Sequence, residues 1–242
     1  MPPSSVALAE RPIAHRGLHD VAAGRPENSI AAFAAAIEHG FAIECDLQPT
    51  ADGRVMVFHD EDLRRLTGSE GLIRQKAARD ISGLRLLGSE EKVPRLAELL
   101  ELVAGRVPLV IELKSVFGEN AGFAEIVAKG LAGYRGALGL MSFDPYLLND
   151  LRRAGHAGPL GLTLMGDATA VKNHLATIAR LDLDFASCRV ADLAHFAPAY
   201  HRLDPARPLI SWTVRTPAEA ELSKSFGAQM TFEGFVPEAA SA

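Results

Sequence analysis

The sequence of 242 residues has little of what marks several common protein classes. It holds two cysteines, Cys45 and Cys188, too few and too far apart for a disulfide framework or a thiolate metal site. No stretch reaches the roughly 20 consecutive apolar residues that a membrane-spanning helix needs. The net charge of −5 argues against a nucleic-acid-binding surface, which is normally basic. We therefore expect neither membrane insertion nor a nucleic-acid partner.

The first residues also lack the marks of an export signal. Residues 1–11 have neither a basic start nor an apolar run, so we expect a cytoplasmic protein. The apolar content of 48% and the charged content of 23% are typical of a folded globular chain. Its length suits one α/β barrel or two small domains. Nothing in the sequence specifies an oligomeric state.

Short β-rich runs alternate with helical patterns along the chain. The strand candidates are residues 13–15, 42–47, 108–113, 137–142, 160–164, 184–187, 209–214 and 229–232. The first helix is expected over residues 29–39, with Asn28 as its cap. Alternating β and α units of this number predict a closed (β/α)₈ TIM barrel, with an open doubly wound sheet as the alternative. The alternative lacks the glycine fingerprint that normally follows its first strand.

One segment departs from this alternation. Residues 60–107 are too long for one βα unit, although 93–103 have the pattern of the second barrel helix. The part at about 61–92 is rich in charge and glycine. We interpret it as an insertion that caps a single domain of residues 1–242, and not as a second domain. Its apolar residues must still become buried: Leu72, Ile73, Ile81, Leu84, Leu86 and Leu87.

Two carboxylates lie on the strand candidate 42–47. Side chains alternate between the two faces of a strand, so Glu44 and Asp46 share a face while Cys45 points into the core. Such a pair repels unless a cation lies between its members, and Mg²⁺ or Ca²⁺ is the natural candidate. An exposed, salt-bridged strand face is the alternative, although strands of a parallel sheet are normally buried on both faces. Glu112 and Lys114 share a face in the same way.

Two histidines bracket these carboxylates. His15 ends a short apolar strand and precedes Arg16, and His59 ends the apolar run 55–58. Histidine exchanges protons near neutral pH, and arginine binds phosphate oxygens with paired N–H groups. Together with a metal site, these residues predict metal-assisted phosphoryl chemistry. The other histidines are expected to be solvated surface residues: His19, His39, His156, His174, His195 and His201.

The order of these motifs resembles the glycerophosphodiester phosphodiesterase family in its bacterial cytoplasmic form. The motifs are HRG at 15–17, PENS at 26–29, ExD at 44–46, HD at 59–60, IELK at 111–114 and WTV at 212–214. Each is weak alone, and all six in order are specific. The resemblance implies hydrolysis of a small glycerophosphodiester to glycerol 3-phosphate and an alcohol, with one divalent ion, Mg²⁺ or Ca²⁺.

The resemblance also implies roles for particular residues. His15 and His59 would act as acid and base, in an order that the sequence leaves open. The metal ligands would be Glu44, Asp46 and Glu112. The substrate contacts would be Arg16, Lys114, Glu27 and Trp212. Structural roles remain as alternatives: an ion pair between Arg16 and Glu27, a helix N-terminus favouring Glu27, packing of Trp212 in the barrel mouth, and a surface position for Lys114.

Two positions depart from the family pattern. Arg215 stands where asparagine usually follows WTV, and Glu233 lies in a loop that replaces the usual T-D-x-P ending. We expect both to change which alcohol is accepted without touching the core chemistry. Two other functions stay open. One is a phospholipase D-like enzyme acting on lysophospholipids, against which the charged insertion argues mildly. The other is a non-catalytic phosphodiester-binding barrel, which predicts loss of a histidine or metal carboxylate, and none is lost.

Overall fold

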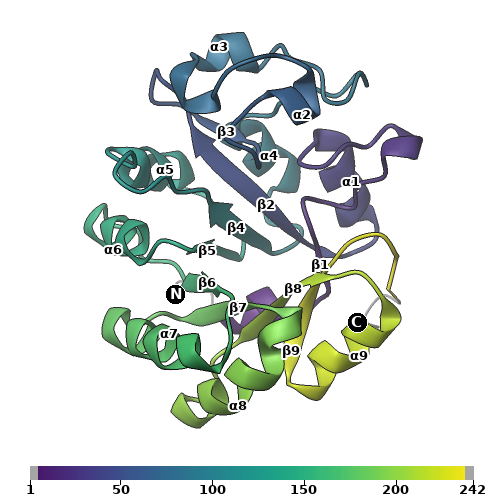
Figure 1. Cartoon of the computed structure of the whole chain (residues 1–242). Coiled ribbons are helices and arrows are strands. Elements are labelled where there is room, and N and C mark those ends of the chain that lie inside the picture. Colours follow the sequence, from purple (N-terminus) through teal and green to yellow (C-terminus); the bar gives the residue numbers. More distant parts are fainter. Residues whose placement is uncertain (1–4, 238–242) are drawn as a thin grey trace.

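Eight parallel strands close into a barrel in the computed structural model, which describes residues 5–237 (Figure 1). They are β1 (Ile13–Ala14), β2 (Ala42–Pro49), β4 (Leu109–Leu113), β5 (Leu138–Ser142), β6 (Leu160–Leu164), β7 (Phe185–Arg189), β8 (Leu209–Val214) and β9 (Ala228–Phe232). The ring closes at β1, where Ile13 pairs with Ala42 on one side and with Thr231 on the other. The predicted (β/α)₈ TIM barrel is confirmed, and the doubly wound sheet is excluded.

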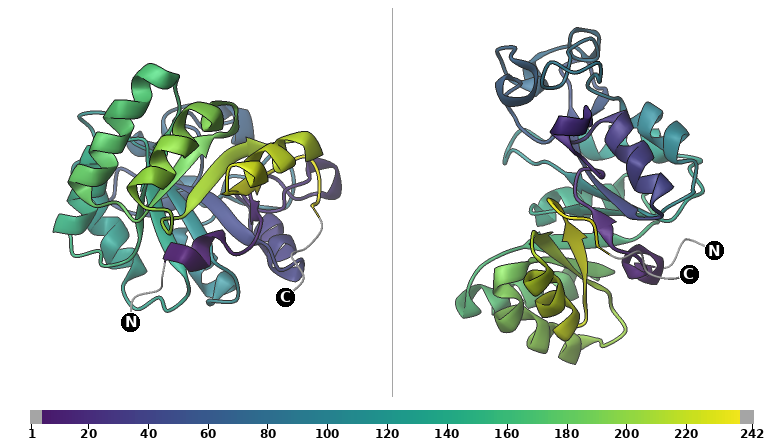
Figure 2. Two further views of the ribbon diagram at one scale, coloured as in Figure 1. Left: turned by 90° about the horizontal axis from the view of Figure 1, so that it is seen from below. Right: turned by 90° about the vertical axis from the view of Figure 1, so that its right-hand side faces the viewer.

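Helices follow the strands and cover the outside of the barrel (Figures 1 and 2). They are α1 (Ile30–Glu38), α4 (Leu96–Val103), α5 (Phe123–Leu131), α6 (Pro145–Arg153), α7 (Ala168–Leu181), α8 (Leu193–Leu203) and α9 (Pro217–Ser225). Asp144 caps α6, and Thr216 with Glu219 forms a capping box at the start of α9. The helix predicted over residues 29–39 is found as α1, but the predicted cap is wrong, because Ser29 and not Asn28 is the N-cap. None of the helices within residues 5–237 has both the length and the apolar character to cross a bilayer.

The barrel interior is filled by side chains. Leu8 enters from the 3₁₀ helix η1 (Ser5–Ala9) and is fully buried there. Glycines provide the space: a Cβ on Gly139 would lie 2.3 Å from Leu8, and one on Gly161 would lie 2.3 Å from the Phe185 ring. This inner cluster consists of Leu8, Ile13, Ala42, Val110, Met141, Phe185 and Ile210. The barrel is therefore a packed core, and open space is found beyond the C-terminal ends of its strands.

The chain leaves the barrel after β2. The end of β2 pairs antiparallel with β3 (Val55–Val57), a strand outside the parallel ring. The short helices α2 (Arg64–Thr67), η3 (Ile73–Gln75) and α3 (Ala78–Ile81) follow and lie together at the top of Figure 1. They share a separate apolar cluster of Met56, Phe58, Leu63, Leu66, Ile73, Ala78, Ile81, Leu86 and Val93. Leu72 and Leu87 stay exposed. Two further 3₁₀ helices are η2 (Val21–Ala23) and η4 (Val190–Asp192).

Candidate active site

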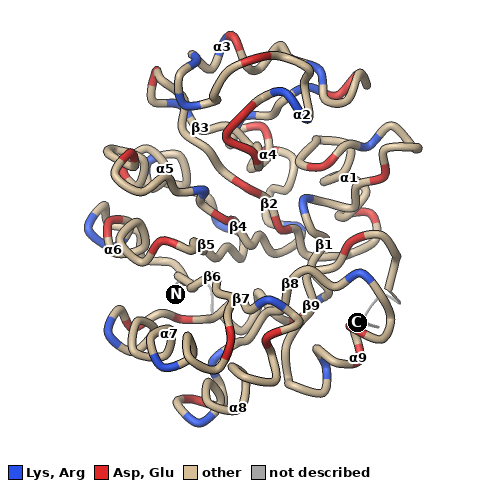
Figure 3. Tube along the Cα trace, viewed as in Figure 1, with Lys and Arg blue, Asp and Glu red and all other residues tan. Residues whose placement is uncertain are grey.

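Three acidic side chains meet above the barrel core on β2 and β4. Glu44 and Asp46 come from β2, and Glu112 comes from β4, directly opposite Asp46 in the register of the two strands. One ligand oxygen from each lies within 4.8 Å of the others, and all three residues are buried. Cys45 is buried among the apolar residues of the outer core, as the alternation of side chains along β2 predicts. Acidic and basic positions gather in this part of the barrel (Figure 3).

Ionisation is electrostatically unfavourable for two of the three carboxyl groups, Glu44 and Glu112. Burial, followed by the charges of Asp46 and Glu112, raises the pKa of Glu44 well above its usual range. Burial likewise raises the pKa of Glu112. Burial opposes ionisation of Asp46 too, but the positive groups around it, Lys114 first, outweigh burial and hold its pKa below the usual range. A buried, all-oxygen donor set that still needs positive charge fits a hard divalent ion such as Mg²⁺ or Ca²⁺.

Two cationic side chains lie against the carboxylates. The Nζ atom of Lys114 is 2.9 Å from Glu112 Oε1 and 3.4 Å from Asp46 Oδ1. The Nε atom of Arg16 is 3.5 Å from Asp46 Oδ2, and its backbone N–H donates to Glu44 Oε2 at 2.9 Å. The Lys114 side chain is 19% exposed, so it is not the freely solvated surface residue of the alternative interpretation. Both cations therefore lie directly beside the three carboxylates.

The turn after β1 requires its glycine. Gly17 has φ +81°, and a Cβ there would lie 2.9 Å from the backbone of Ala32 in α1. Arg16 also adopts a positive φ of 55°, a conformation that non-glycine residues rarely adopt and that concentrates at functional sites. The tight turn lets the chain pass close to α1 while the Arg16 N–H still reaches Glu44. This geometry explains why glycine follows His15 and Arg16.

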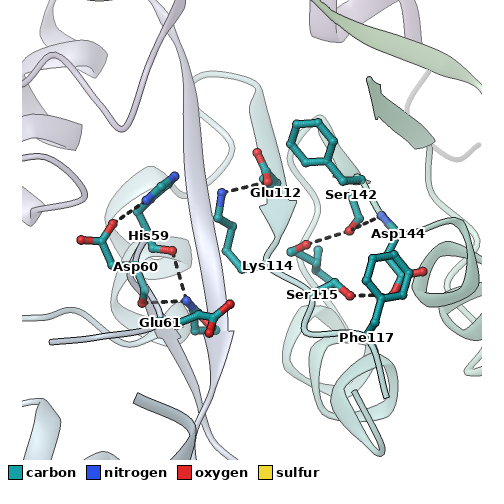
Figure 4. Close-up of a pocket in the computed structure, with 12 residues that line it drawn as sticks. His59, Asp60, Glu61, Glu112, Lys114, Ser115, Phe117, Ser142 and Asp144 are labelled. Atoms are coloured by element: carbon teal, nitrogen blue, oxygen red, sulfur yellow. Dashed lines mark hydrogen bonds and ion pairs between the residues drawn. The ribbon is translucent and has the colours of Figure 1, made fainter. Parts of the chain in front are cut away.

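Each of the two predicted catalytic histidines directs Nδ1 to a carboxylate. His15 Nδ1 lies 2.5 Å from Glu233 Oε2, while its Nε2 lies 3.9 Å from Glu44 Oε2. His59 Nδ1 lies 2.7 Å from Asp60 Oδ1, and Figure 4 marks this contact with a dashed line. An acceptor at Nδ1 favours a proton there and leaves Nε2 to the site. Burial lowers the pKa of both imidazoles, which favours their neutral forms.

Glu27 and Arg16 form the ion pair that the sequence offered as their structural alternative. Arg16 Nη1 donates to Glu27 Oε1 at 2.6 Å. Glu27 also accepts from Arg65 of α2, whose Nη1 and Nη2 lie 2.8 and 2.7 Å from its two oxygens. The Nε atom of Arg65 lies 2.5 Å from Asp60 Oδ2. Nothing in the sequence marks Arg65, because its carboxylate partners are 38 and 5 residues away along the chain.

Two further residues reach the site against expectation. Asn28, predicted as a helix cap, is buried and donates from Nδ2 to Asp46 Oδ2 at 2.9 Å. Its place in the PENS motif was the signal that could have revealed this role. His19, expected on the solvated surface, has Nε2 3.6 Å from Glu233 Oε2. Glu233 itself, expected only to select the alcohol, contacts His15 directly.

Two cavities flank the carboxylates. One of about 470 Å³ lies toward the insertion and is lined in part by Phe117 and Asp144 (Figure 4). The other, of about 420 Å³, is lined in part by Trp212 and Arg215. The residues that line both are His59, Glu112, Lys114 and Phe143. Trp212 packs edge-on against Phe143, with ring centres 5.5 Å apart, and donates from Nε1 to the Ser187 carbonyl. It therefore both packs in the mouth and faces the second cavity.

Comparison with solved structures supports the fold. A phosphodiesterase from Oleispira antarctica, solved in complex with the product sn-glycerol-3-phosphate, matches with a TM-score of 0.83 at 20% identity, over 95% of each chain. A glycerophosphodiester phosphodiesterase from Thermotoga maritima matches with a TM-score of 0.74 at 23% identity, over 91% of this chain and 92% of that one. Both carry the same barrel.

Comparison with sequences identifies the family. Curated relatives include a glycerophosphodiester phosphodiesterase from Caldanaerobacter subterraneus, 35% identical over 62% of this chain and 65% of that protein. Another, from Bacillus altitudinis, is 35% identical over 50% of this chain and 52% of that protein. These alignments span less than two thirds of the relatives' lengths. The family model matches residues 15–232, from the first predicted catalytic histidine to the end of β9, and on that match the chain belongs to the glycerophosphoryl diester phosphodiesterase family.

Proposed function

We propose that this protein hydrolyses small glycerophosphodiesters to glycerol 3-phosphate and an alcohol with the help of one divalent ion, Mg²⁺ or Ca²⁺. The observation that carries the proposal is the convergence of three buried carboxylates, within 4.8 Å of one another, beside two cations and two histidines. A phosphodiester has two arms joined at phosphorus. A phosphate at the junction of the two cavities would leave one cavity for each arm.

Charge on the phosphate would be balanced from several sides. Glu44, Asp46 and Glu112 would hold the ion, which when bound supplies positive charge to the phosphate oxygens and orients the nucleophile. Arg16 and Lys114 would stabilise the charge that develops in the transition state. Lys114 contacts two of these carboxylates, and its ammonium group would therefore lie close to a phosphate bound at the ion.

The histidines would move the protons. One takes a proton from the nucleophile and the other gives a proton to the leaving alkoxide, each through Nε2. The carboxylate at each Nδ1, Glu233 for His15 and Asp60 for His59, would orient the ring and stabilise the imidazolium form. Water can serve as the nucleophile. The substrate's own glycerol 2-hydroxyl can also serve, and it would give a cyclic phosphate first.

The substrate class is supported by family membership. Relatives that match this chain are named glycerophosphodiester phosphodiesterases, and the matching Oleispira structure is described as a complex with the product sn-glycerol-3-phosphate. A non-catalytic binding barrel would have no need to keep both histidines and all three carboxylates. Their retention and convergence argue for catalysis.

A second candidate, hydrolysis of lysophospholipids, gains one specific observation. The charged insertion argued against an apolar mouth, but apolar side chains are exposed in the loops after β4, β5 and β6 and in the first turn of α6. Their exposed fractions are 72% for Phe117, 40% for Phe143, 73% for Tyr146 and 51% for Met165. Phe117 and Phe143 line the first cavity. An acyl chain could therefore leave the cavity over an apolar rim.

One experiment tests both candidates. Purified protein is assayed with a panel of glycerophosphodiesters and one lysophospholipid, with and without excess chelator, and all products are identified. We expect glycerol 3-phosphate from the glycerophosphodiesters, loss of turnover on chelation, and recovery with Mg²⁺ or Ca²⁺. Asp46→Asn should abolish turnover, whereas Glu101→Gln, an exposed carboxylate on α4, should not. Full activity of metal-free protein in chelator would refute the metal, and no glycerol 3-phosphate from any diester would refute the substrate class.

A further inference from the structure

We propose that Glu233 and Arg215 are a positioning pair that holds His15 in its working orientation. The inference rests on the proposed function, and it gives a different role to two residues that were expected from the sequence to select the alcohol. The carboxylate of Glu233 bridges the two side chains with one oxygen each. Oε2 lies 2.5 Å from His15 Nδ1, and Oε1 lies 2.6 Å from Arg215 Nη2.

The barrel brings this pair together through strand register. Val214 at the end of β8 pairs with Phe232 at the end of β9. The next residue on each strand, Arg215 and Glu233, therefore emerges at the same height, and the Glu233 N–H donates to the Val214 carbonyl at 3.0 Å. β1 lies on the other side of β9 and delivers His15, whose N–H donates to the Phe232 carbonyl. Backbone bonds thus fix all three residues before their side chains meet.

A further contact holds the backbone of Arg215. The Arg215 N–H donates to Glu219 Oε2 at 2.7 Å, which ties the base of the arginine to the first turn of α9. The Glu233 and His15 side chains are 19% and 13% exposed, whereas Arg215 is 60% exposed. The contact between Glu233 and His15 is therefore largely buried, and Glu233 is bound on its other oxygen by the exposed Arg215 side chain. An arginine anchored in this way limits the movement of the carboxylate it binds.

The same arrangement occurs at the second histidine and is built from unrelated parts of the chain. There Asp60 binds His59 Nδ1 at 2.7 Å and Arg65 Nε at 2.5 Å. Among the histidines that the structure describes, His15 and His59 are the two whose Nδ1 contacts a carboxylate. These are the two histidines that the motifs assign to catalysis. The same histidine–carboxylate–arginine unit occurs at both of these histidines. This repetition indicates that the reaction requires imidazole rings held in a fixed orientation, with Nε2 directed into the site.

The variants Glu233→Leu, Glu233→Gln and Arg215→Leu test the proposal, with Arg180→Leu on α7 as the control for loss of an exposed arginine. Steady-state kinetics on a glycerophosphodiester separate kcat from KM, and ¹⁵N NMR of the His15 ring reports which nitrogen carries the proton. We expect Glu233→Leu to lower kcat by about 10²-fold, the lower end of a general acid–base contribution. Arg215→Leu should lower kcat by a smaller factor, and KM should change little in both.

The NMR readout gives the tautomer directly. Wild type and Glu233→Gln, which keeps an acceptor oxygen, should both show the proton on Nδ1, and Glu233→Leu should show a mixture of tautomers. The Gln variant should also retain a much higher kcat than the Leu variant.

Two results would overturn the proposal. One is a rise in KM with unchanged kcat in Arg215→Leu and Glu233→Leu, which would favour substrate contact. The other is an unchanged tautomer in Glu233→Leu. If Glu233→Leu fails to fold, the kinetics of Arg215→Leu decide. A lower kcat with little change in KM supports the positioning role, and a higher KM with unchanged kcat overturns it. If wild type hydrolyses no glycerophosphodiester, the proposed function fails, while the ring signals still decide whether Glu233 positions His15.

Discussion

Arg65 binds both carboxylate oxygens of Glu27, at 2.7 and 2.8 Å, although 38 residues separate the two side chains. Arg65 belongs to α2 in the insertion, and Glu27 precedes α1 beside the first barrel strand. Glu27 also binds Arg16, and Arg65 also binds Asp60. The insertion is therefore linked to both sides of the candidate active site, to a predicted phosphate ligand through Glu27 and to His59 through Asp60.

Arg65→Leu should lower kcat by about 10-fold and leave the barrel folded, because an Asp60 side chain without its arginine holds His59 less firmly. Steady-state kinetics and thermal unfolding measure the two effects. Arg64→Leu is the matched control, since Arg64 is the neighbouring residue and pairs with Glu70 in an exposed contact. Equal values of kcat for the two variants would show that Arg65 does not support catalysis through Asp60 and His59.

Glu44→Gln should stabilise the metal-free protein, and more so as the pH rises. The folded-state pKa of Glu44 is raised above its ordinary value of 4.5, so the stability that Glu44 contributes is complete below that value and is lost as pH increases through the raised pKa. The glutamine variant has no such loss. In chelator, the difference in Tm between variant and wild type should therefore grow from pH 5 to pH 8.

A divalent ion should make wild type the more stable of the two proteins. Added Mg²⁺ or Ca²⁺ binds the folded state and should raise the Tm of wild type but hardly that of Glu44→Gln. Asp46 does not affect this comparison between pH 5 and pH 8. Its pKa is lowered in the folded state, so its contribution to folding stability is lost only as the pH falls below its ordinary pKa of 3.8. A Tm difference that stays constant from pH 5 to pH 8 would contradict the electrostatic account of the cluster.

His15→Ala and His59→Ala should both reduce hydrolysis of an alkyl glycerophosphodiester by about 10²–10⁴-fold, the usual contribution of a general acid or base. They should differ on an aryl phosphodiester, whose phenolate leaves without needing a proton. The variant that lacks the acid should recover much of its relative rate there, and the variant that lacks the base should not. His195→Ala, exposed on α8, is the control. A near wild-type kcat for either variant on the alkyl substrate would remove that histidine from the mechanism.

Replacing residues 61–92 by a short loop tests whether they form a cap. We expect a folded barrel with a raised KM and a kcat no higher than that of Arg65→Leu, because the replacement also removes Arg65. The apolar cluster of the insertion includes Met56, Phe58 and Val93, which lie outside the replaced segment, so those three positions need polar substitutions in the same variant. Circular dichroism and Tm report the fold. Insoluble protein would mean that the segment belongs to the barrel core.

The parts of the site that follow a local period could be predicted from the sequence. Alternation along one strand places Glu44 and Asp46 on the same face with Cys45 opposite, and the structure has them so. The count of β and α units predicts the barrel, because each unit is visible within about 30 residues of chain. The role of Glu112 came from family resemblance, since the register that sets it opposite Asp46 joins strands far apart in sequence.

The remaining contacts depend on closure of the ring. His15 and Glu233 are 218 residues apart, and no periodicity links them. The cap of α1 could not be predicted either, because two neighbouring residues, Asn28 and Ser29, are both good helix caps. In the folded protein Ser29 caps the helix, and Asn28 donates to the Asp46 carboxylate. Charged residues such as Arg65 look alike on any exposed segment until the fold gives them partners.

The two-residue strand β1 pairs with both β2 and β9, and this closure has a consequence for the protein during its synthesis. A ribosome has delivered every proposed metal ligand once residue 112 is made, and both histidines well before that. Yet His15 meets Glu233 only after β9 has been made and has docked beside β1. A nascent chain can thus carry the whole proposed metal site on β2 and β4 while its first histidine still lacks the carboxylate that orients it.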